Sequence, residues 1–193
     1  MDLFADDSRP QQVLDDAEGG VRYWPRLVSA DTADAWFEAL RQAPWASHRR
    51  PMYDRVVDVP RLLASWPVDQ WPATLPLGAI LAQVQALAPA PYNAVGMNLY
   101  RDGRDSVAMH NDKLHTIVAG MPIALVSLGD PRRMRIKPKH APGRIDLDLA
   151  HGSLLVMSHA SQLSHEHGIP KTTRPAGPRM SVVFRVRPAA HAR

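Results

Sequence analysis

The sequence contains no cysteine, and this absence narrows the chemistry that is open to the chain. Without thiols there is no disulfide bond, no thiolate metal site and no cysteine nucleophile. Histidine and the carboxylates of aspartate and glutamate remain as metal ligands, so any metal would be bound through nitrogen and oxygen. Enzymes that depend on a thiol are therefore excluded.

Long hydrophobic runs are also lacking. No stretch approaches the roughly 18–20 consecutive apolar residues that a membrane-spanning helix requires. The N-terminal segment MDLFADDSRPQQ is acidic, whereas a secretory signal would be positively charged. Internal repeats and low-complexity tracts are absent as well. We therefore expect a cytoplasmic protein that does not bind membranes and is monomeric.

The size and charge of the chain suggest one domain with an anionic partner. Its 193 residues, 45% of them hydrophobic, can build one sizeable core but not two comfortable domains. We predict a loose, acidic lead-in over residues 1–19 and a single domain over residues 20–193. Residues 1–100 hold 8 basic and 12 acidic side chains, and residues 101–193 hold 15 and 7. This basic surplus favours nucleic acid or an acidic metabolite, with ordinary solubilising charge as the alternative.

Two segments of the first half have the spacing of amphipathic helices. One helix is predicted from Asp31 or Thr32, either of which can cap it, to about Gln42. Its apolar residues recur on one face: Ala33, Trp36, Phe37 and Leu40. A second helix is predicted over residues 77–87 on the same grounds. Residues 44–76, which are rich in proline and hold three of the five tryptophans, predict an irregular or strand-and-loop segment that we interpret as a candidate substrate lid.

Short runs with the composition of β-strands dominate the rest of the chain. One such run covers residues 21–28, and the others follow Tyr92, separated by turn signals. The later runs are residues 94–100, 122–128, 134–137, 144–149, 153–157 and 179–186. Many short strands with glycine and proline between them predict a sandwich or jelly roll. Helices followed by strands predict the α+β class.

The sharpest local feature is His110-Asn111-Asp112. In a strand, residues i and i+2 point to the same face, so His110 and Asp112 can coordinate one metal ion. Two ligands are too few, but another histidine would complete a set of two histidines and one carboxylate that leaves three coordination positions open. Spacing alone does not choose that histidine among His151, His159, His165 and His167. The alternative is an exposed polar strand end.

One face of the last predicted strand carries two arginines. The residues that share this face are Arg179, Ser181, Val183 and Arg185. The opposite face is apolar and points into a core: Met180, Val182 and Phe184. Arginines on the inner side of an apolar strand need an anion, and a dicarboxylate that chelates the metal would satisfy them. Asn98 and Tyr100, on one side of another strand, can also donate to carboxylate oxygens. An exposed basic strand face is the alternative.

Taken together, these motifs occur in the order seen in AlkB-like dioxygenases. They are Asn98-x-Tyr100, the following Arg-Asp-Gly-Arg-Asp-Ser, His110-x-Asp112, His151-Gly-Ser-Leu-Leu, His167-x-x-Pro170 and Arg179-x-Ser-x-x-Phe-Arg185. The sequence resembles this family from about residue 60 to residue 187, and it most resembles the nucleic-acid demethylase branch. The resemblance implies an α+β fold with a double-stranded β-helix (jelly-roll) core and N-terminal helices packed on one sheet.

The resemblance also assigns roles to individual residues. It implies that His110, Asp112 and His167 bind Fe(II), and it selects His167 over His165 because the ligand of the family precedes a short segment that ends in proline. It implies that Tyr100 and Arg179 bind the distal carboxylate of 2-oxoglutarate. Asn98 and Arg185 would lie near the metal-chelating end of the same molecule.

The activity that follows from the resemblance is that of an iron(II)/2-oxoglutarate-dependent dioxygenase. With O₂, such enzymes convert 2-oxoglutarate to succinate and CO₂ and hydroxylate a nearby C–H bond. On an N-alkylated base, the product falls apart to an aldehyde and the repaired base, which must first leave its stack. The resemblance therefore implies DNA or RNA repair. The alternatives are a hydroxylase or demethylase of a protein or small molecule, and a non-catalytic binding module on the same scaffold.

The sequence departs from the family mainly where the substrate would bind. The family often has acidic residues after the metal-binding aspartate, where this chain has Lys113, Leu114 and His115. A Tyr-rich segment that stacks on the base is replaced by residues 67–71, and the usual asparagine between the two arginines is Ser181. Substitute stacking residues are Trp66, Trp71 or Tyr53, with Arg49, Arg50 and Arg55 on phosphates. Core aromatics and solvated charges are the alternative interpretation.

Overall fold

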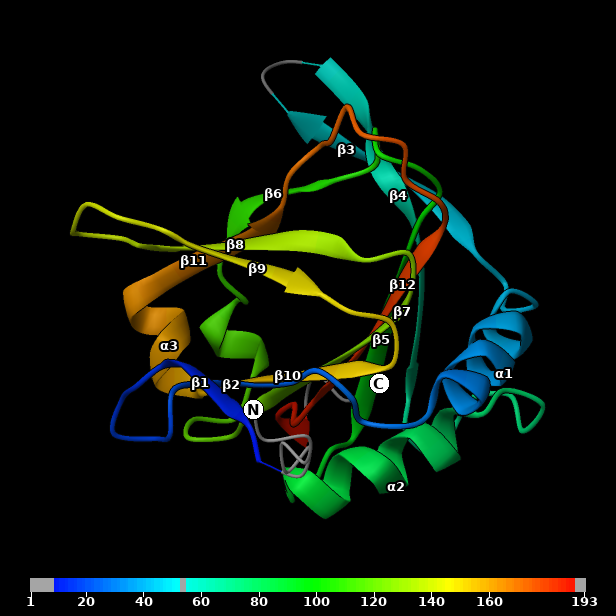
Figure 1. The fold of residues 1–193 in the computed structure, drawn as a ribbon, viewed down its shortest axis with the longest axis horizontal. Helices are drawn as coiled ribbons and strands as arrows, with labels where there is room; N and C mark the ends of the chain where they lie inside the picture. The colour runs from blue at the N-terminus through cyan, green and yellow to red at the C-terminus, as the bar shows by residue number, and fades with distance from the viewer. Residues whose placement is uncertain (1–8, 53–54, 190–193) are drawn as a thin grey trace, which may run out of the picture.

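Two antiparallel β-sheets face each other in the computed structural model, which describes residues 9–52 and 55–189 (Figure 1). The larger sheet has the order β1-β2-β10-β7-β12-β5-β4-β3. Its strands are β1 (Gln11–Leu14), β2 (Val21–Trp24), β3 (Ala46–Met52), β4 (Arg55–Pro67), β5 (Ala94–Tyr100), β7 (Ile123–Gly129), β10 (Ser153–Met157) and β12 (Arg179–Arg185). The smaller sheet, in the order β6-β11-β8-β9, contains β6 (Val107–His110), β8 (Arg132–Pro138), β9 (Ile145–Leu149) and β11 (His165–Ile169).

The path of the chain between the sheets is that of a jelly roll. From β5 onward the chain passes repeatedly from one sheet to the other, and only β8 and β9 follow each other within one sheet. This arrangement confirms the predicted jelly-roll core. The helices are α1 (Ala30–Leu40), α2 (Leu77–Leu87) and α3 (His159–Ser164), with a 3₁₀ turn at Leu114–Thr116. None of the helices in the described ranges is long and apolar enough to span a membrane.

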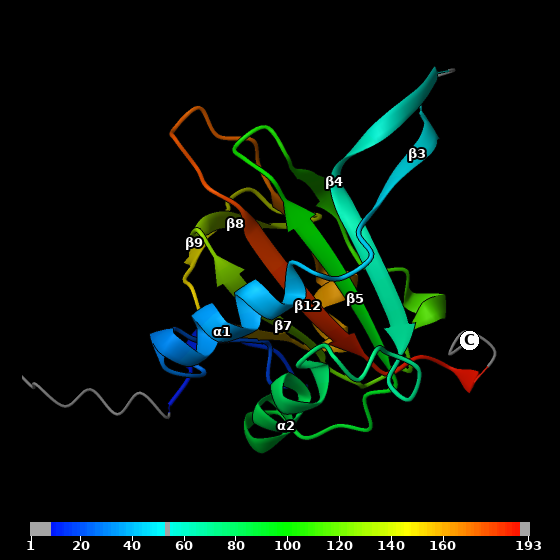
Figure 2. The ribbon, with the colours of Figure 1, turned by 90° about the vertical axis from the view of Figure 1, so that its right-hand side faces the viewer.

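Two hydrophobic cores lie on opposite faces of the larger sheet. The first, the helix-side core, is formed between this sheet and helices α1 and α2, which cover its outer face (Figure 2). The second lies between the two sheets. In β12, Met180, Val182 and Phe184 belong to the first core and Val183 belongs to the second, which confirms the predicted alternation. Strand β12 is therefore buried on both faces.

Several predicted boundaries agree with the structure and others differ for identifiable reasons. Strands β5 and β10 and helix α2 begin and end as predicted. Helix α1 begins one residue before Asp31, and its cap is Ser29, whose Oγ accepts a hydrogen bond from the Thr32 backbone N–H at 3.3 Å. Strand β2 ends at Trp24 because Pro25 has no N–H to continue the ladder.

The predicted loose lead-in is wrong for residues 11–19. Residues 11–14 form strand β1, which pairs with β2, and an edge strand this short carries no alternating pattern that the sequence would reveal. The acidic residues that follow are also bound: Asp16 accepts a hydrogen bond from the Ser158 hydroxyl at 2.6 Å, and Glu18 accepts one from the Ala160 N–H at 2.7 Å. This segment is therefore fixed to the start of α3.

The candidate lid, residues 44–76, contains the β3–β4 hairpin. The second half of β4 pairs with β5 inside the larger sheet, while the tip of the hairpin projects beyond it (Figure 2). Trp66 and Trp71 are half-buried and pack against the helix-side core, which favours the interpretation as core aromatics; that either stacks on a substrate base stays a prediction. Tyr53 lies outside the described residues, as do the side chains of Arg50 and Arg55. A lid function of residues 44–76 stays a prediction.

We expect the helix-side core to depend on Phe184, which is fully buried with the rings of Trp71 and Tyr92 at 6.5 and 6.2 Å. Truncation in Phe184→Ala leaves a cavity and should lower the free energy of unfolding by about 3–5 kcal/mol in denaturant titrations. The control Leu163→Ala removes a side chain that is 55% exposed and should change stability by no more than about 0.5 kcal/mol. Similar losses in the two variants would contradict this assignment of the core.

Candidate functional site

Neighbouring strands of the smaller sheet place two histidines side by side. His167 in β11 is paired directly with His110 at the end of β6, and their ring centroids are 4.5 Å apart. Gly168 allows this close approach, because a Cβ there would lie 2.8 Å from the Val107 carbonyl oxygen. His165, the alternative left open by spacing, is instead paired with Pro138.

Asp112 reaches the same site from a different local structure than predicted. Strand β6 ends at His110, so the alternation argument for His110 and Asp112 does not apply, and Asp112 lies in the connection that follows. Its carboxylate accepts two hydrogen bonds from Arg185, from Nε at 2.8 Å and from Nη2 at 3.1 Å. Its backbone N–H donates to Oε1 of Gln162 at 3.0 Å. Asp112 is thereby held between β12 and α3.

The environment sets the charge of each group. Burial raises the pKa of Asp112, but the charge and the hydrogen bonds of Arg185 lower it by more, so the net pKa is below its usual value. Burial, together with the nearby His110, lowers the pKa of His167 to about 4. Nδ1 of His110 lies 2.9 Å from the Ala108 carbonyl oxygen, which can only accept, and in a neutral imidazole this contact places the lone pair on Nε2.

The chemistry of these donors fits a divalent iron. A neutral imidazole and an ionised carboxylate are the forms in which histidine and aspartate bind metals. As the side chains stand, no three His, Asp or Glu residues in the described part of the chain converge on one point, and the Asp112 carboxylate faces Arg185. The residues therefore fit Fe(II) by donor type, and the assignment of the ligands stays a prediction.

Arg179 carries a positive charge although its side chain is completely buried. Its Nε donates to the Ser127 hydroxyl at 3.1 Å, and its guanidinium lies 5.0 Å from the ring centroid of Tyr100, its register partner in β5. Burial lowers the pKa of Arg179, and the Tyr100 phenol opposes this by favouring the charged form. Neither terminal nitrogen has a hydrogen-bond partner of good geometry within the described ranges. Such a group implies an anionic partner between the sheets.

Asn98 and Arg185 lie on the same face of the paired strands β5 and β12. The Asn98 amide donates to the Ser181 hydroxyl at 3.1 Å, and its oxygen accepts from Nε of Arg61 at 2.7 Å. Gly96 lies between Asn98 and the position opposite Arg185, and a Cβ there would be 3.5 Å from Nη1 of Arg185. The four residues predicted to hold 2-oxoglutarate thus line one inward-facing surface.

Comparisons with known proteins identify the family. Residues 61–185 match the sequence pattern of the 2OG-Fe(II) oxygenase superfamily. The chain belongs to this superfamily. Within it the chain is AlkB-like, as the motifs predicted.

Two relatives illustrate this similarity. The chain is 28% identical over 184 residues to the alpha-ketoglutarate-dependent dioxygenase alkB homolog 3 of Bos taurus, a match that covers 83% of this chain and 64% of that protein. It is 32% identical over 117 residues to the DNA oxidative demethylase ALKBH2 of Homo sapiens, covering 56% and 45%. The chain thus spans less than two thirds of these members of the superfamily.

Sequence reasoning missed two buried polar residues of this 2OG-Fe(II) oxygenase site. Gln162 lies on the short helix α3, and its helical spacing carries no sign that it contacts Asp112. Arg132 is in phase with the inward-facing Met134 and Ile136, as Arg179 is with Val183. It was overlooked because the predicted strand began at residue 134 rather than at Arg132.

We expect Gln162→Leu to destabilise the protein, because it leaves the Asp112 N–H without its acceptor in a buried place. A loss of about 1–3 kcal/mol in the free energy of unfolding is typical for such a group. The same substitution at the exposed Gln83 on α2 is the control and should change stability by no more than about 0.5 kcal/mol. If denaturant titrations give Gln162→Leu the stability of the wild type, the hydrogen bond to Asp112 is not important.

Proposed function

We propose that the chain is an iron(II)/2-oxoglutarate-dependent dioxygenase that oxidatively dealkylates N-alkylated bases in nucleic acid. The observation that carries this proposal is Arg179, a buried cation on a surface shared with Asn98 and Arg185, whose two terminal nitrogens have no hydrogen-bond partner of good geometry among the described residues. A dicarboxylate bound between that surface and the His110–His167 pair would satisfy this cation.

His110, Asp112 and His167 would hold Fe(II) in this proposal. The chemistry that bound iron supplies is the activation of O₂, coupled to the decarboxylation of 2-oxoglutarate to succinate and CO₂. The fixed contacts of the ligands serve this purpose: the Ala108 carbonyl orients the His110 ring, and Gln162 orients Asp112. One oxygen atom enters succinate and the other enters the hydroxylated substrate.

The cosubstrate would be oriented by the inward-facing surface of β5 and β12. Arg179 and Tyr100 would bind its distal carboxylate, because a guanidinium can donate two parallel hydrogen bonds to one carboxylate. Asn98 and Arg185 would lie nearer its 2-oxo acid end. Since Arg185 also binds Asp112, it links the cosubstrate to a metal ligand through one side chain.

Nucleic acid is the proposed substrate on two grounds. The similar human protein is named as a DNA oxidative demethylase, and residues 101–193 carry 15 basic and 7 acidic side chains. The substrate base would leave its stack to reach the site, and the hydroxylated N-alkyl group would break its C–N bond to release an aldehyde. The cytoplasmic location, the monomeric state and the single domain over residues 20–193 stay predictions.

A second candidate, hydroxylation or demethylation of a protein or small molecule, is favoured by two observations. Trp66 and Trp71 are half-buried against the helix-side core, which leaves less of each ring open to a base. The connection after Asp112 also presents the exposed Lys113 in place of an acidic residue.

The dioxygenase chemistry is tested by the conversion of 2-oxoglutarate to succinate with added Fe(II) and no substrate. His110→Ala removes a proposed metal ligand. Losing a residue that only hydrogen-bonds to a metal ligand lowers activity by roughly 10–100-fold, so the loss of the ligand itself should lower this turnover by more. His140→Ala, which changes an exposed histidine outside the site, should leave turnover unchanged. Equal turnover in His110→Ala and the wild type would refute the proposed ligands.

The substrate class is tested with oligonucleotides, both DNA and RNA, that carry N-methylated bases. We expect release of formaldehyde in proportion to succinate, with the repaired base detected by mass spectrometry. Unmethylated oligonucleotides of the same sequence are the control. Succinate formation without any aldehyde or oligonucleotide binding would retain the dioxygenase and exclude nucleic acid as its substrate.

A further inference from the structure

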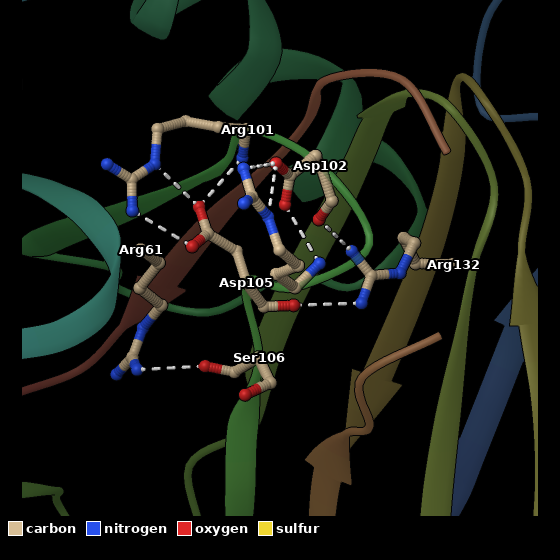
Figure 3. Close-up of polar contacts among 7 residues, drawn as sticks. Arg61, Arg101, Asp102, Asp105, Ser106 and Arg132 are labelled. Carbon is tan, nitrogen blue, oxygen red and sulfur yellow. Dashed lines mark hydrogen bonds and ion pairs between the residues drawn. The ribbon is translucent and has the colours of Figure 1, made fainter. Parts of the chain in front are cut away.

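Arg132, the first residue of β8, is a buried cation whose hydrogen bonds all go to backbone carbonyls. Nη1 donates to the carbonyl oxygen of Asp102 at 3.0 Å and Nη2 to that of Asp105 at 2.9 Å (Figure 3). Nη2 also donates to the carbonyl oxygen of Pro170 at 2.9 Å. Only 3% of the residue is exposed, and no carboxylate in the described part of the chain forms an ion pair with it. The guanidinium of Arg132 therefore holds separate segments of the chain together through its hydrogen bonds.

The three carbonyls belong to segments that lead to the site. Residues 101–106 connect Tyr100, at the end of β5, to β6 and His110, and Pro170 directly follows β11, which carries His167. The 101–106 connection is itself rigid, because the Asp105 carboxylate accepts hydrogen bonds from the backbone N–H, Nε and Nη2 of Arg101 (Figure 3). The Arg132 side chain thus fixes the ends of three strands. These are β6 and β11, which carry the two histidines, and β5, which carries Tyr100.

Arg132 also brings a second positive charge to Tyr100. Its guanidinium lies 5.7 Å from the Tyr100 ring centroid, and that of Arg179 lies 5.0 Å from the same ring. After burial, the charge of Arg132 is a further cause of the lowered pKa of Arg179, as expected for two neighbouring cations. Holding two guanidiniums against one phenol without a carboxylate is unfavourable in itself. Arg132 therefore helps to make this place attractive to an anion.

We propose that Arg132 is a positioning residue that makes the site select a 2-oxo dicarboxylic acid over a 2-oxo monocarboxylic acid. It does so by holding Tyr100 and the 101–106 connection in place beside Arg179 and by adding its own positive charge. The inference rests on the proposed function, because it concerns the subsite for the distal carboxylate of 2-oxoglutarate.

The test compares the binding of two ligands that differ at the distal carboxylate. Dissociation constants for 2-oxoglutarate and for 2-oxobutyrate, which lacks that carboxylate, are measured by calorimetry with the full chain, Mn(II) in place of iron, and no O₂. Arg132→Met should lower the ratio of the 2-oxobutyrate constant to the 2-oxoglutarate constant by about tenfold or more, the effect of losing a charge-assisted contact. A general loss of structure would weaken both ligands and leave this ratio unchanged.

Two further variants make the test decisive. Arg133→Met, at the next position of β8, removes an exposed arginine paired with Asp148 and should keep the wild-type ratio. Arg132→Lys keeps the charge but cannot reach three carbonyls, so its ratio should also fall, and it carries the test if Arg132→Met does not fold. A wild-type ratio in either folded Arg132 variant would overturn the proposal. Failure of the wild-type protein to bind 2-oxoglutarate would instead overturn the proposed function.

Discussion

Strand β12 is buried on both faces, and this constraint determines where the site lies. Its apolar face is held under α1 and α2 by Met180, Val182 and Phe184. Because side chains alternate, Arg179 and Arg185 have no alternative to the space between the sheets. A shift of one residue in register would expose three large apolar side chains to that space and would place both arginines under the helices. The helix-side core therefore fixes the orientation of the arginines that are proposed to bind the cosubstrate.

The site concentrates positive charge where a folded protein normally avoids it. Arg132 and Arg179 are buried and form no ion pair with a carboxylate in the described part of the chain, and Arg185 is paired with the ionised Asp112. Buried cations without counter-ions cost stability, so such an arrangement is maintained only if it serves binding. A dianionic ligand with a divalent metal would neutralise it: two carboxylates match two guanidiniums, and the metal matches Asp112 together with neutral histidines. The charges of the site are thus balanced in the complex with the ligand and the metal, and not in the free protein.

What the sequence could predict follows from how local each signal is. The alternation of β12, the extent of β5 and β10, and helix α2 are encoded in consecutive residues, and the structure agrees with them. The positions that failed depend on contacts made elsewhere. Arg185 and Gln162 fix the position of Asp112, although β6 has already ended. The contacts of Gln162 and Arg132 join segments that lie tens of residues apart, so no spacing rule would reveal them.

The two halves of the proposed function rest on different parts of the molecule. The residues proposed to bind iron or 2-oxoglutarate lie on β5, β6, β11 and β12, except for Asp112, which is held by its ion pair to Arg185 of β12. Strands of a packed core hold side chains precisely enough for oxidation. Substrate choice falls to connections, as is usual for binding residues. Trp66 and Trp71 are half-buried against the helix-side core, so the proposed recognition of a substrate would rely more on the segment after Asp112. The departures from the family lie mainly at residues 67–71 and after Asp112, whereas the proposed metal and 2-oxoglutarate residues match it, so the same scaffold would allow the substrate to change while the chemistry is retained.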